Sequence, residues 1–256
     1  MNTNQTITLT FGDRAENHKG MQIIGQSFNK GYNLVDLLFI QAKFDNIGCE
    51  TTLYDLNEDL DKKDLYDSYI LVINNFFNDN ELDELFNEQK NLDYDKKAFM
   101  YGRVVNKNAR HNLCFSNFNQ EPDYENGKGR IISFNSLDKL NNMRNKLNEY
   151  IDNFTNLQGE SNYYYDITKC GIGYHGDTER KIVIGIRLGS DLPLYYQCYY
   201  KNDKIGNKIK IELTNGSIYI MTEKASGNDW KSKNKYTFRH ATGCDKFIEW
   251  LNYLEY

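Results

Sequence analysis

Two histidines and one aspartate have the residue types and the spacing of a metal site. His175 and Asp177 are separated by one residue, so on an extended segment their side chains point to the same side. His240 follows much later, at the end of a predicted strand. Two imidazoles and one carboxylate form the facial triad that suits non-haem Fe(II) and leaves positions open for a chelating co-substrate and O2. We therefore predict His175, Asp177 and His240 as catalytic metal ligands.

The strands that must bring these side chains together lie after residue 160. Short β-branched and aromatic segments alternate there with turn residues and leave no room for helices, which predicts antiparallel strands in a sandwich or barrel. A histidine at a strand end more often makes only hydrogen bonds, so it is this β-rich setting that favours the metal site. The predicted strands are Tyr163–Ile167, Lys181–Leu188, Leu192–Tyr200, Ile209–Leu213, Ser217–Thr222 and Tyr236–His240.

The first part of the chain mixes strands with helices. Alternating residues predict strands, and apolar residues at helical spacing predict helices, the last of them capped by Ser136. A polar loop is expected at Asn106–Asn112, and a closing helix at Cys244–Tyr256. The predicted strands are Thr6–Phe11, Glu50–Tyr54, Tyr69–Phe76, Ala98–Val105 and Ile131–Phe134, and the helices are Tyr32–Phe44, Asn80–Gln89 and Ser136–Ile151.

The composition predicts a folded protein without a membrane-spanning segment. The chain has 256 residues, a formal charge of −5, and 20 Tyr and 14 Phe, which supply enough buriable surface for a folded core. The apolar runs are too short to span a membrane, and no secretory signal begins the sequence. Five cysteines without paired spacing predict free thiols in a reducing compartment. We expect a cytoplasmic protein with no membrane partner, and a nuclear location fits equally.

Two stretches of sequence resemble one enzyme family. Tyr163–Gly189 (YYYDITKCGIGYHGDTERKIVIGIRLG) and Leu213–Gly243 (LTNGSIYIMTEKASGNDWKSKNKYTFRHATG) resemble the AlkB-type Fe(II)/2-oxoglutarate dioxygenases, which carry H-x-D-x-[DE] before an apolar strand and a histidine in a later one. The resemblance extends over about residues 69–243. It implies an α+β protein with a double-stranded β-helix (jelly-roll) core and an N-terminal α/β layer. It also implies Fe(II) as cofactor and 2-oxoglutarate and O2 as co-substrates.

The resemblance also implies roles for further residues. Tyr165 matches a tyrosine that contacts 2-oxoglutarate, within one position, and Glu179 matches an acidic residue that touches a flipped base. The segment Gly102–Phe115 lies where the family has its substrate-recognition lid. Its basic and amide-rich run is the only local candidate for phosphate contact. The substrate-binding residues predicted there are Arg103, Asn106 and Arg110.

The sequence departs from the family at the co-substrate anchor. The family holds the distal carboxylate of 2-oxoglutarate with an arginine in an R-x5-R pattern after the second histidine, and no arginine follows His240 here. A buried dicarboxylate needs another cation. We predict Arg187, which replaces a serine of the family pattern, with Lys246 as a weaker candidate. Arg239 is adjacent to His240 and points to the opposite face of its strand.

The expected function is a dioxygenase that hydroxylates or demethylates a modified nucleobase in nucleic acid. The alternatives are hydroxylation of a protein residue or small molecule by the same superfamily, and a non-catalytic jelly-roll binding module. A nucleic-acid enzyme predicts a positive groove, and a small-molecule enzyme predicts a closed pocket. We expect residues 1–65 to form a β-α-β extension and residues 66–256 the jelly-roll domain, with no sequence signal for an oligomeric state. The residues expected in such a groove are Arg103, Lys107, Arg110 and Arg180.

Overall fold

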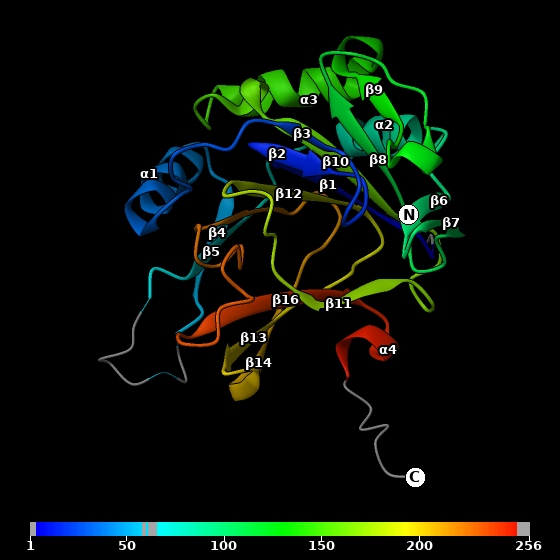
Figure 1. Ribbon diagram of the computed structural model, residues 1–256. Helices are drawn as coiled ribbons and strands as arrows, with labels where there is room; N and C mark the ends of the chain where they lie inside the picture. The colour runs from blue at the N-terminus through cyan, green and yellow to red at the C-terminus, as the bar shows by residue number, and fades with distance from the viewer. Residues whose placement is uncertain (1–3, 58–59, 61–65, 250–256) are drawn as a thin grey trace.

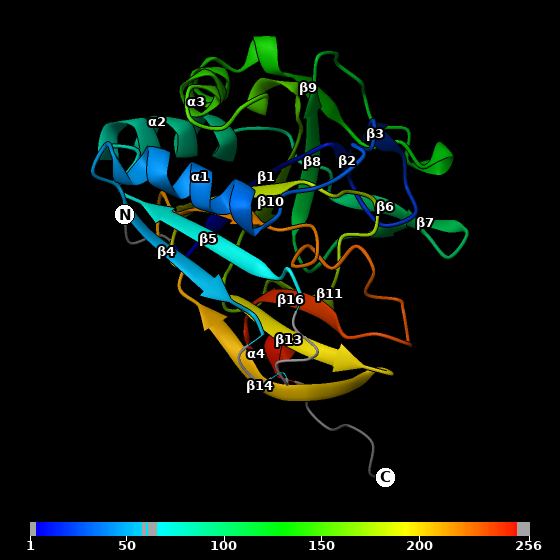
Figure 2. The ribbon, with the colours of Figure 1, turned by 90° about the vertical axis from the view of Figure 1, so that its left-hand side faces the viewer.

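The computed structural model describes residues 4–57, 60 and 66–249. The molecule is a mixed α/β protein with more strand than helix, as predicted. Three layers lie on one another: helices, a large sheet and a smaller sheet (Figures 1 and 2). None of the described helices is long and apolar enough to span a lipid bilayer. All five cysteines are free thiols.

The large sheet has eight strands. Its strands pair antiparallel, except that β8 and β9 are parallel. β1 lies in the interior of this sheet, between β10 and β12. In spatial order the strands are β4 (Glu50–Asp55), β5 (Tyr69–Asn74), β15 (Ile218–Met221), β12 (Val183–Gly189), β1 (Thr6–Gly12), β10 (Gln158–Tyr164), β8 (His111–Ser116) and β9 (Ile131–Ser133).

Three helices, α1 (Leu34–Asp45), α2 (Asp79–Lys90) and α3 (Asp138–Asn148), cover one face of the large sheet (Figure 1). α1 begins at a capping box in which Asn33 and Asp36 each accept a hydrogen bond from the other's backbone N–H. α2 begins with the same arrangement. Strand alternation supplies the surface beneath them, because every second residue of a strand points to the helices. On β1 these residues are Ile7, Leu9 and Phe11.

The other face of the large sheet packs against a four-stranded sheet with the order β11 (Gly171–His175), β16 (Thr237–Gly243), β13 (Leu194–Tyr200) and β14 (Asp203–Ile211). The pairings across the C-terminal half are nested: β13 with β14, β12 with β15, and β11 with β16. The short helix α4 (Asp245–Ile248) follows β16. A second apolar cluster between the sheets joins Val183 and Tyr219 to Leu194, Tyr196 and Phe238.

Two hairpins and three short 3-10 helices complete the described elements. The first hairpin follows β1 and contributes Glu16 to the pocket described below. The second hairpin lies beside β8 (Figure 2). The elements are β2 (Arg14–Glu16), β3 (Ile23–Gly25), β6 (Lys97–Met100), β7 (Arg103–Asn106), η2 (Tyr124–Asn126), η3 (Phe134–Ser136) and η4 (Phe154–Asn156).

The structure corrects two predictions around residue 100. The predicted strand Ala98–Val105 is a hairpin, because Tyr101 and Gly102 adopt positive φ angles of 53° and 75° and reverse the backbone between β6 and β7. The predicted loop Asn106–Asn112 ends early, since β8 already begins at His111 and pairs with β10. Polar residues at the start of β8 concealed a strand that is buried in the sheet.

Three further element ends differ from the prediction. Ser136 does not cap α3, because its hydroxyl donates to the Ser133 carbonyl and the helix begins after Leu137. β10 ends at Tyr164, earlier than the strand predicted for Tyr163–Ile167. The closing helix is confirmed only over the four residues of α4, and residues 250–256 lie outside the described part.

The first strand of the predicted N-terminal layer lies inside the large sheet. β1 is hydrogen-bonded on both edges and contributes Ile7, Leu9 and Phe11 to the core, so this strand shares the sheet and the core with the rest of the protein. An interior strand has no exposed backbone edge and cannot be added as a separate layer. The domain boundary at residue 65 stays a prediction.

We predict that Gly185→Ala destabilises the fold by about 1–3 kcal/mol, because an added methyl in a close-packed interior forces neighbouring atoms to move. A Cβ at Gly185 would collide with the Tyr219 ring on the neighbouring strand β15. Urea unfolding measures the change. The matched control is Gly173→Ala, whose Cβ would meet its nearest atom at 3.7 Å. Equal stability of the two variants would contradict the packing argument.

Candidate metal centre

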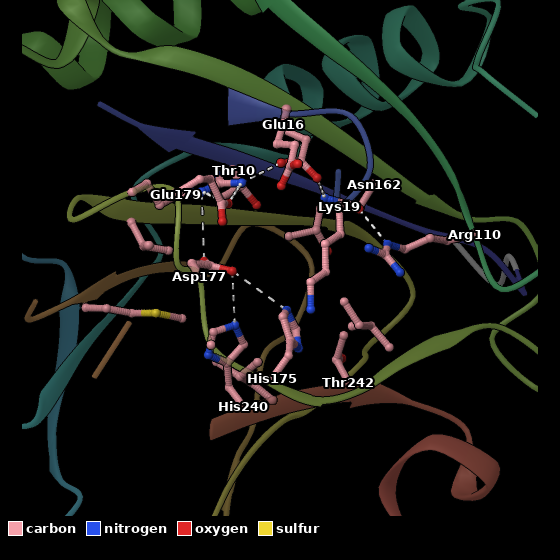
Figure 3. Close-up of a pocket in the computed structure, with 18 of the residues that line it drawn as sticks. Thr10, Glu16, Lys19, Arg110, Asn162, His175, Asp177, Glu179, His240 and Thr242 are labelled. Carbon is pink, nitrogen blue, oxygen red and sulfur yellow. Dashed lines mark hydrogen bonds and ion pairs between the residues drawn. The ribbon is translucent and has the colours of Figure 1, made fainter. Parts of the chain in front are cut away.

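The structure brings the three predicted ligands together. His175, the last residue of β11, is the register partner of His240 on β16, and Asp177 follows two residues later. Their ligand atoms all lie within 4.8 Å of one another. Asp177 Oδ1 is 3.7 Å from His175 Nε2 and 3.8 Å from His240 Nε2 (Figure 3). Three converging donors of this type have the geometry of a facial metal site.

The surroundings of both imidazoles favour the neutral form. His175 Nδ1 lies 2.8 Å from the Gly173 carbonyl, which fixes the proton on Nδ1 and leaves the Nε2 lone pair toward Asp177. Burial lowers the pKa of His175, opposed by the Asp177 charge. Burial and then His175 hold the pKa of His240 well below its usual value. A neutral imidazole is the form that binds a metal.

Gly176, between His175 and Asp177, is required by close packing. A Cβ at this position would collide with the Gly227 carbonyl and lie 2.8 Å from Cδ1 of Trp230. The Asp177 backbone N–H donates to the Ser226 carbonyl at 3.0 Å. The loop between β15 and β16 therefore holds the aspartate in place, and only glycine lets that loop approach.

The triad lies at the wall of a pocket of about 360 Å³. The pocket lies between the two sheets, and the large sheet contributes the residues that point away from the helices. Val183, Leu194 and Met221 supply apolar surface. The polar residues that the large sheet contributes are Thr8, Thr10, Glu160, Asn162, Tyr164, Arg187 and Tyr219.

Arg187 lines this pocket with most of its hydrogen-bonding capacity unused. The residue is 0% exposed, and Nη1 donates to Thr8 Oγ1, its register partner on β1. Nε and Nη2 are buried without a partner, and burial lowers the pKa of the guanidinium. A buried charged group with unpaired donors is costly unless an anion binds it. Arg187 is therefore suited to hold a carboxylate.

Arg180 provides a contrast at similar depth. Its Nη2 lies 2.7 Å from Glu160 Oε2 and 2.7 Å from Glu179 Oε1. Its Nε is 4.0 Å from Asp177 Oδ2. The charge of Arg180 is thus neutralised within the protein, and it needs no ligand.

The predicted tyrosine is displaced by one position. Tyr165 does not line the pocket, because its hydroxyl donates to the Asn108 carbonyl at 2.8 Å and its ring stacks on His111 at 4.6 Å. Tyr164, the last residue of β10, lines the pocket instead. Adjacent residues of a strand point to opposite faces, so this shift decides which hydroxyl reaches the site.

Of the predicted substrate-binding residues, two reach the pocket. Arg110 lines it and donates from Nε to Asn162 Oδ1 at 2.7 Å, and Glu179 lines it beside Arg180. Arg103 and Asn106 lie on β7 and do not line the pocket.

Of the four cations expected in a basic groove, only Arg110 and Arg180 line the pocket, and Arg180 is already paired, so the groove is not assembled there. Arg180 is 5% exposed and paired. Lys107 donates to Asn17 Oδ1 at 2.6 Å, and burial lowers its pKa to about 8.

Two other cations considered for the co-substrate anchor lie outside the pocket. Arg239 stacks on Tyr199 at 3.9 Å, outside the pocket, as predicted from its position beside His240. Lys246 does not line the pocket either.

Sequence reasoning missed the residues after β1. Glu16, Asn17, His18 and Lys19 line the pocket, although their segment has no counterpart in the resemblance. Asp13 fixes the exit from β1, because its Oδ1 accepts from two backbone N–H groups of residues 181 and 182 at 2.9 and 3.0 Å. The available signal was a dense run of titratable residues directly after a strand.

Comparison with known proteins gives a family without a stated activity. No protein-family model matches the sequence. A protein of Acanthamoeba polyphaga mimivirus, named "Uncharacterized protein R156", is 52% identical over 249 residues, which cover 96% of this chain and 98% of that protein. The protein described here therefore belongs to the same family as that mimivirus protein.

We predict that the apo-protein binds one Co(II) per molecule at the triad, giving visible d–d absorption. His240→Ala should weaken binding by more than the roughly 10- to 100-fold caused by loss of an outer-sphere partner, since a direct ligand is removed. His111→Ala is the control, because His111 stacks on Tyr165 outside the pocket. Unchanged Co(II) affinity in His240→Ala would exclude the site.

A second prediction concerns Glu16 and the pH dependence of stability. Burial raises the pKa of the Glu16 carboxyl from 4.5 to about 7. The folded state therefore binds more protons than the unfolded state between these values, and this contribution to stability is lost as pH rises through them. Between pH 5 and about 7 the free energy of unfolding should fall less in Glu16→Gln than in wild type. Glu149→Gln, at the exposed C-terminal end of α3, should follow wild type; identical slopes in all three proteins would refute the assignment.

Proposed function

We propose that this member of the R156 family is an Fe(II)- and 2-oxoglutarate-dependent dioxygenase that oxidises a C–H bond of an organic substrate. The observation that carries the proposal is the presence in one pocket of the converged triad and of Arg187, whose Nε and Nη2 have no hydrogen-bond partner. The triad supplies the donor set that non-haem Fe(II) favours. The buried guanidinium supplies a bidentate partner for the distal carboxylate of 2-oxoglutarate.

The strand pairings support a jelly-roll core for this enzyme. The nested pairs β13–β14, β12–β15 and β11–β16 describe one long antiparallel ribbon rolled on itself. The next pair of such a ribbon would join β10 to a strand that follows β16. β1 occupies this place, paired with β10 and β12. In our proposal the first strand of the protein thus completes a double-stranded β-helix.

This exchange of strands accounts for the missing arginine. In the AlkB-type pattern the anchoring arginine follows the second histidine, on the strand that β1 replaces here. β1 presents Thr8 and Thr10 to the pocket, and Arg187 lies opposite Thr8 on the neighbouring strand β12. In our proposal the cation is therefore supplied to the pocket from the adjacent strand β12.

The protein's part in the reaction is to bind, orient and exclude water. Bound Fe(II) and 2-oxoglutarate would supply the oxidation, in which O2 and 2-oxoglutarate convert a C–H group to C–OH and leave succinate and CO2. Arg187 would hold the distal carboxylate. Tyr219 stays a hydrogen-bond donor, because burial raises its pKa to about 12. Apolar residues such as Leu194 and Met221 limit water around the reacting groups.

The alternative of a binding module without turnover has less support. Such a module has no need for three converging ligands or for a buried arginine without a carboxylate partner, and both features carry an energetic cost. The nucleobase substrate suggested by the resemblance has weaker support than the reaction type, because the expected basic groove is not assembled.

We predict that anaerobic addition of Fe(II) and 2-oxoglutarate to the apo-protein produces a saturable visible metal-to-ligand charge-transfer band. His175→Ala should abolish the band. Arg187→Met should raise the dissociation constant for 2-oxoglutarate by a factor of about 100, as expected for about 3 kcal/mol lost on removing one partner of a buried charge pair.

The stability of the apo-protein distinguishes this role from a structural one. Removing an unpaired buried charge should leave the free energy of unfolding of Arg187→Met equal to or higher than that of wild type. A folded wild-type protein that gives no band would refute the dioxygenase. A normal band in Arg187→Met would refute the anchor.

A further inference from the structure

The mouth of the pocket carries two cations without a carboxylate partner. Arg110 bonds through Nε to the Asn162 amide oxygen, and Lys19 lies over the Trp230 ring at 5.3 Å. Within the described part of the protein, neither cation forms an ion pair. Both line the pocket that contains the triad.

The same mouth carries a carboxyl group without a cation. Glu16 Oε1 accepts a hydrogen bond from the Gly20 backbone N–H at 2.6 Å, and no described cation pairs with it. Burial, with the nearby charges of Glu179 and Glu160, keeps the pKa of Glu16 near 7. Glu179 and Glu160 both pair with Arg180, whereas Glu16 has no cationic partner among the described residues, so Glu16 is the acid to which a ligand cation can bind.

The two kinds of charge are separated across the pocket. Figure 3 shows Glu16 and Glu179 above the metal ligands, and Arg110 to the right of them. Lys19 extends between them toward His175 in the same view. A ligand that spans these groups must carry a positive charge at one end and a negative charge at the other, with its carbon skeleton facing the triad.

We propose that the substrate is a small zwitterion of the α-amino-acid class. Its carboxylate binds Arg110 and Lys19, its ammonium group binds Glu16, and one of its aliphatic C–H groups faces the metal ligands. The assignment of a reaction rests on the proposed dioxygenase, whereas the binding of the zwitterion does not. Charge-assisted bonds to both ends fix the orientation of a small substrate better than either bond alone.

A nucleic acid fits this mouth less well. Phosphates bind where several exposed cations follow one surface, and two of the four candidates, Lys107 and Arg180, already bond to groups of the protein itself. Glu16 and Glu179 would repel a phosphate at the entrance. The pocket of about 360 Å³ must also accept 2-oxoglutarate, which leaves room for a small molecule.

The test is a calorimetric titration of the full-length protein with each standard L-amino acid, with and without Co(II) and 2-oxoglutarate. At least one amino acid should bind, and its N-acetyl and methyl-ester forms should bind at least about tenfold more weakly, because each removes one charge. Glu16→Gln and Arg110→Met should each weaken binding of the free amino acid by a similar factor. Lys19→Met should act in the same direction, and Lys90→Met, at the end of α2, should not.

The outcomes separate this inference from the dioxygenase. Absence of amino-acid binding in a protein that shows the Fe(II)/2-oxoglutarate band overturns the zwitterion site alone. Binding without that band supports the site and removes the proposed reaction. Equal binding of the N-acetyl and ester forms, or binding of a single-stranded oligonucleotide in place of amino acids, also overturns the inference. Arg110→Lys keeps the charge, and its partial retention of binding guards against a folding defect in Arg110→Met.

Discussion

The insertion of β1 between β10 and β12 is the constraint on which the rest of the structure depends. Every residue of β1 is a register partner of β10, and Thr6–Phe11 also pair with β12, so backbone groups that would otherwise be buried without partners are satisfied on both edges. Without this strand the large sheet would divide into two parts with open edges. The same strand carries Ile7, Leu9 and Phe11 into the helix-covered core and Thr8 and Thr10 into the pocket.

The position of β1 also determines how the pocket closes. The backbone leaves β1 at Asp13, which is tied to the start of β12, and immediately supplies Glu16 and Lys19 to the mouth. The loop before β16 brings Trp230 against Gly176 and beneath the Lys19 ammonium group. The three residues of the triad are thus enclosed by segments far apart in the sequence. Sheet register sets the two histidines opposite each other, and the loop before β16 holds Asp177.

The charged residues of the pocket differ in whether the protein itself supplies a partner for their charge. Arg180 and Arg187 are both buried, but the first has two carboxylates within 2.7 Å and the second has only a threonine hydroxyl as partner. A charge that the fold has already paired contributes to structure, and a charge that it has left unpaired is available to a ligand. By the same reasoning Arg110, Lys19 and Glu16, which have no ion-pair partner among the described residues, are the groups that we propose to bind the charged ends of the substrate.

The sequence by itself determined the three residues of the triad and most of the elements, because alternation and helical spacing are local properties and H-x-D on an extended segment directs two side chains to one side. It also predicted Arg187 at the pocket, from its place in the family pattern that the sequence resembles, and the structure has Arg187 in the pocket wall. Only the tertiary structure decided that Tyr164 faces the pocket in place of Tyr165, that Lys107 and Arg180 are used within the protein, and that the segment after β1 forms the mouth. These outcomes depend on which strand lies beside which, and pairing between β1 and strands more than 140 residues away leaves no trace in local spacing.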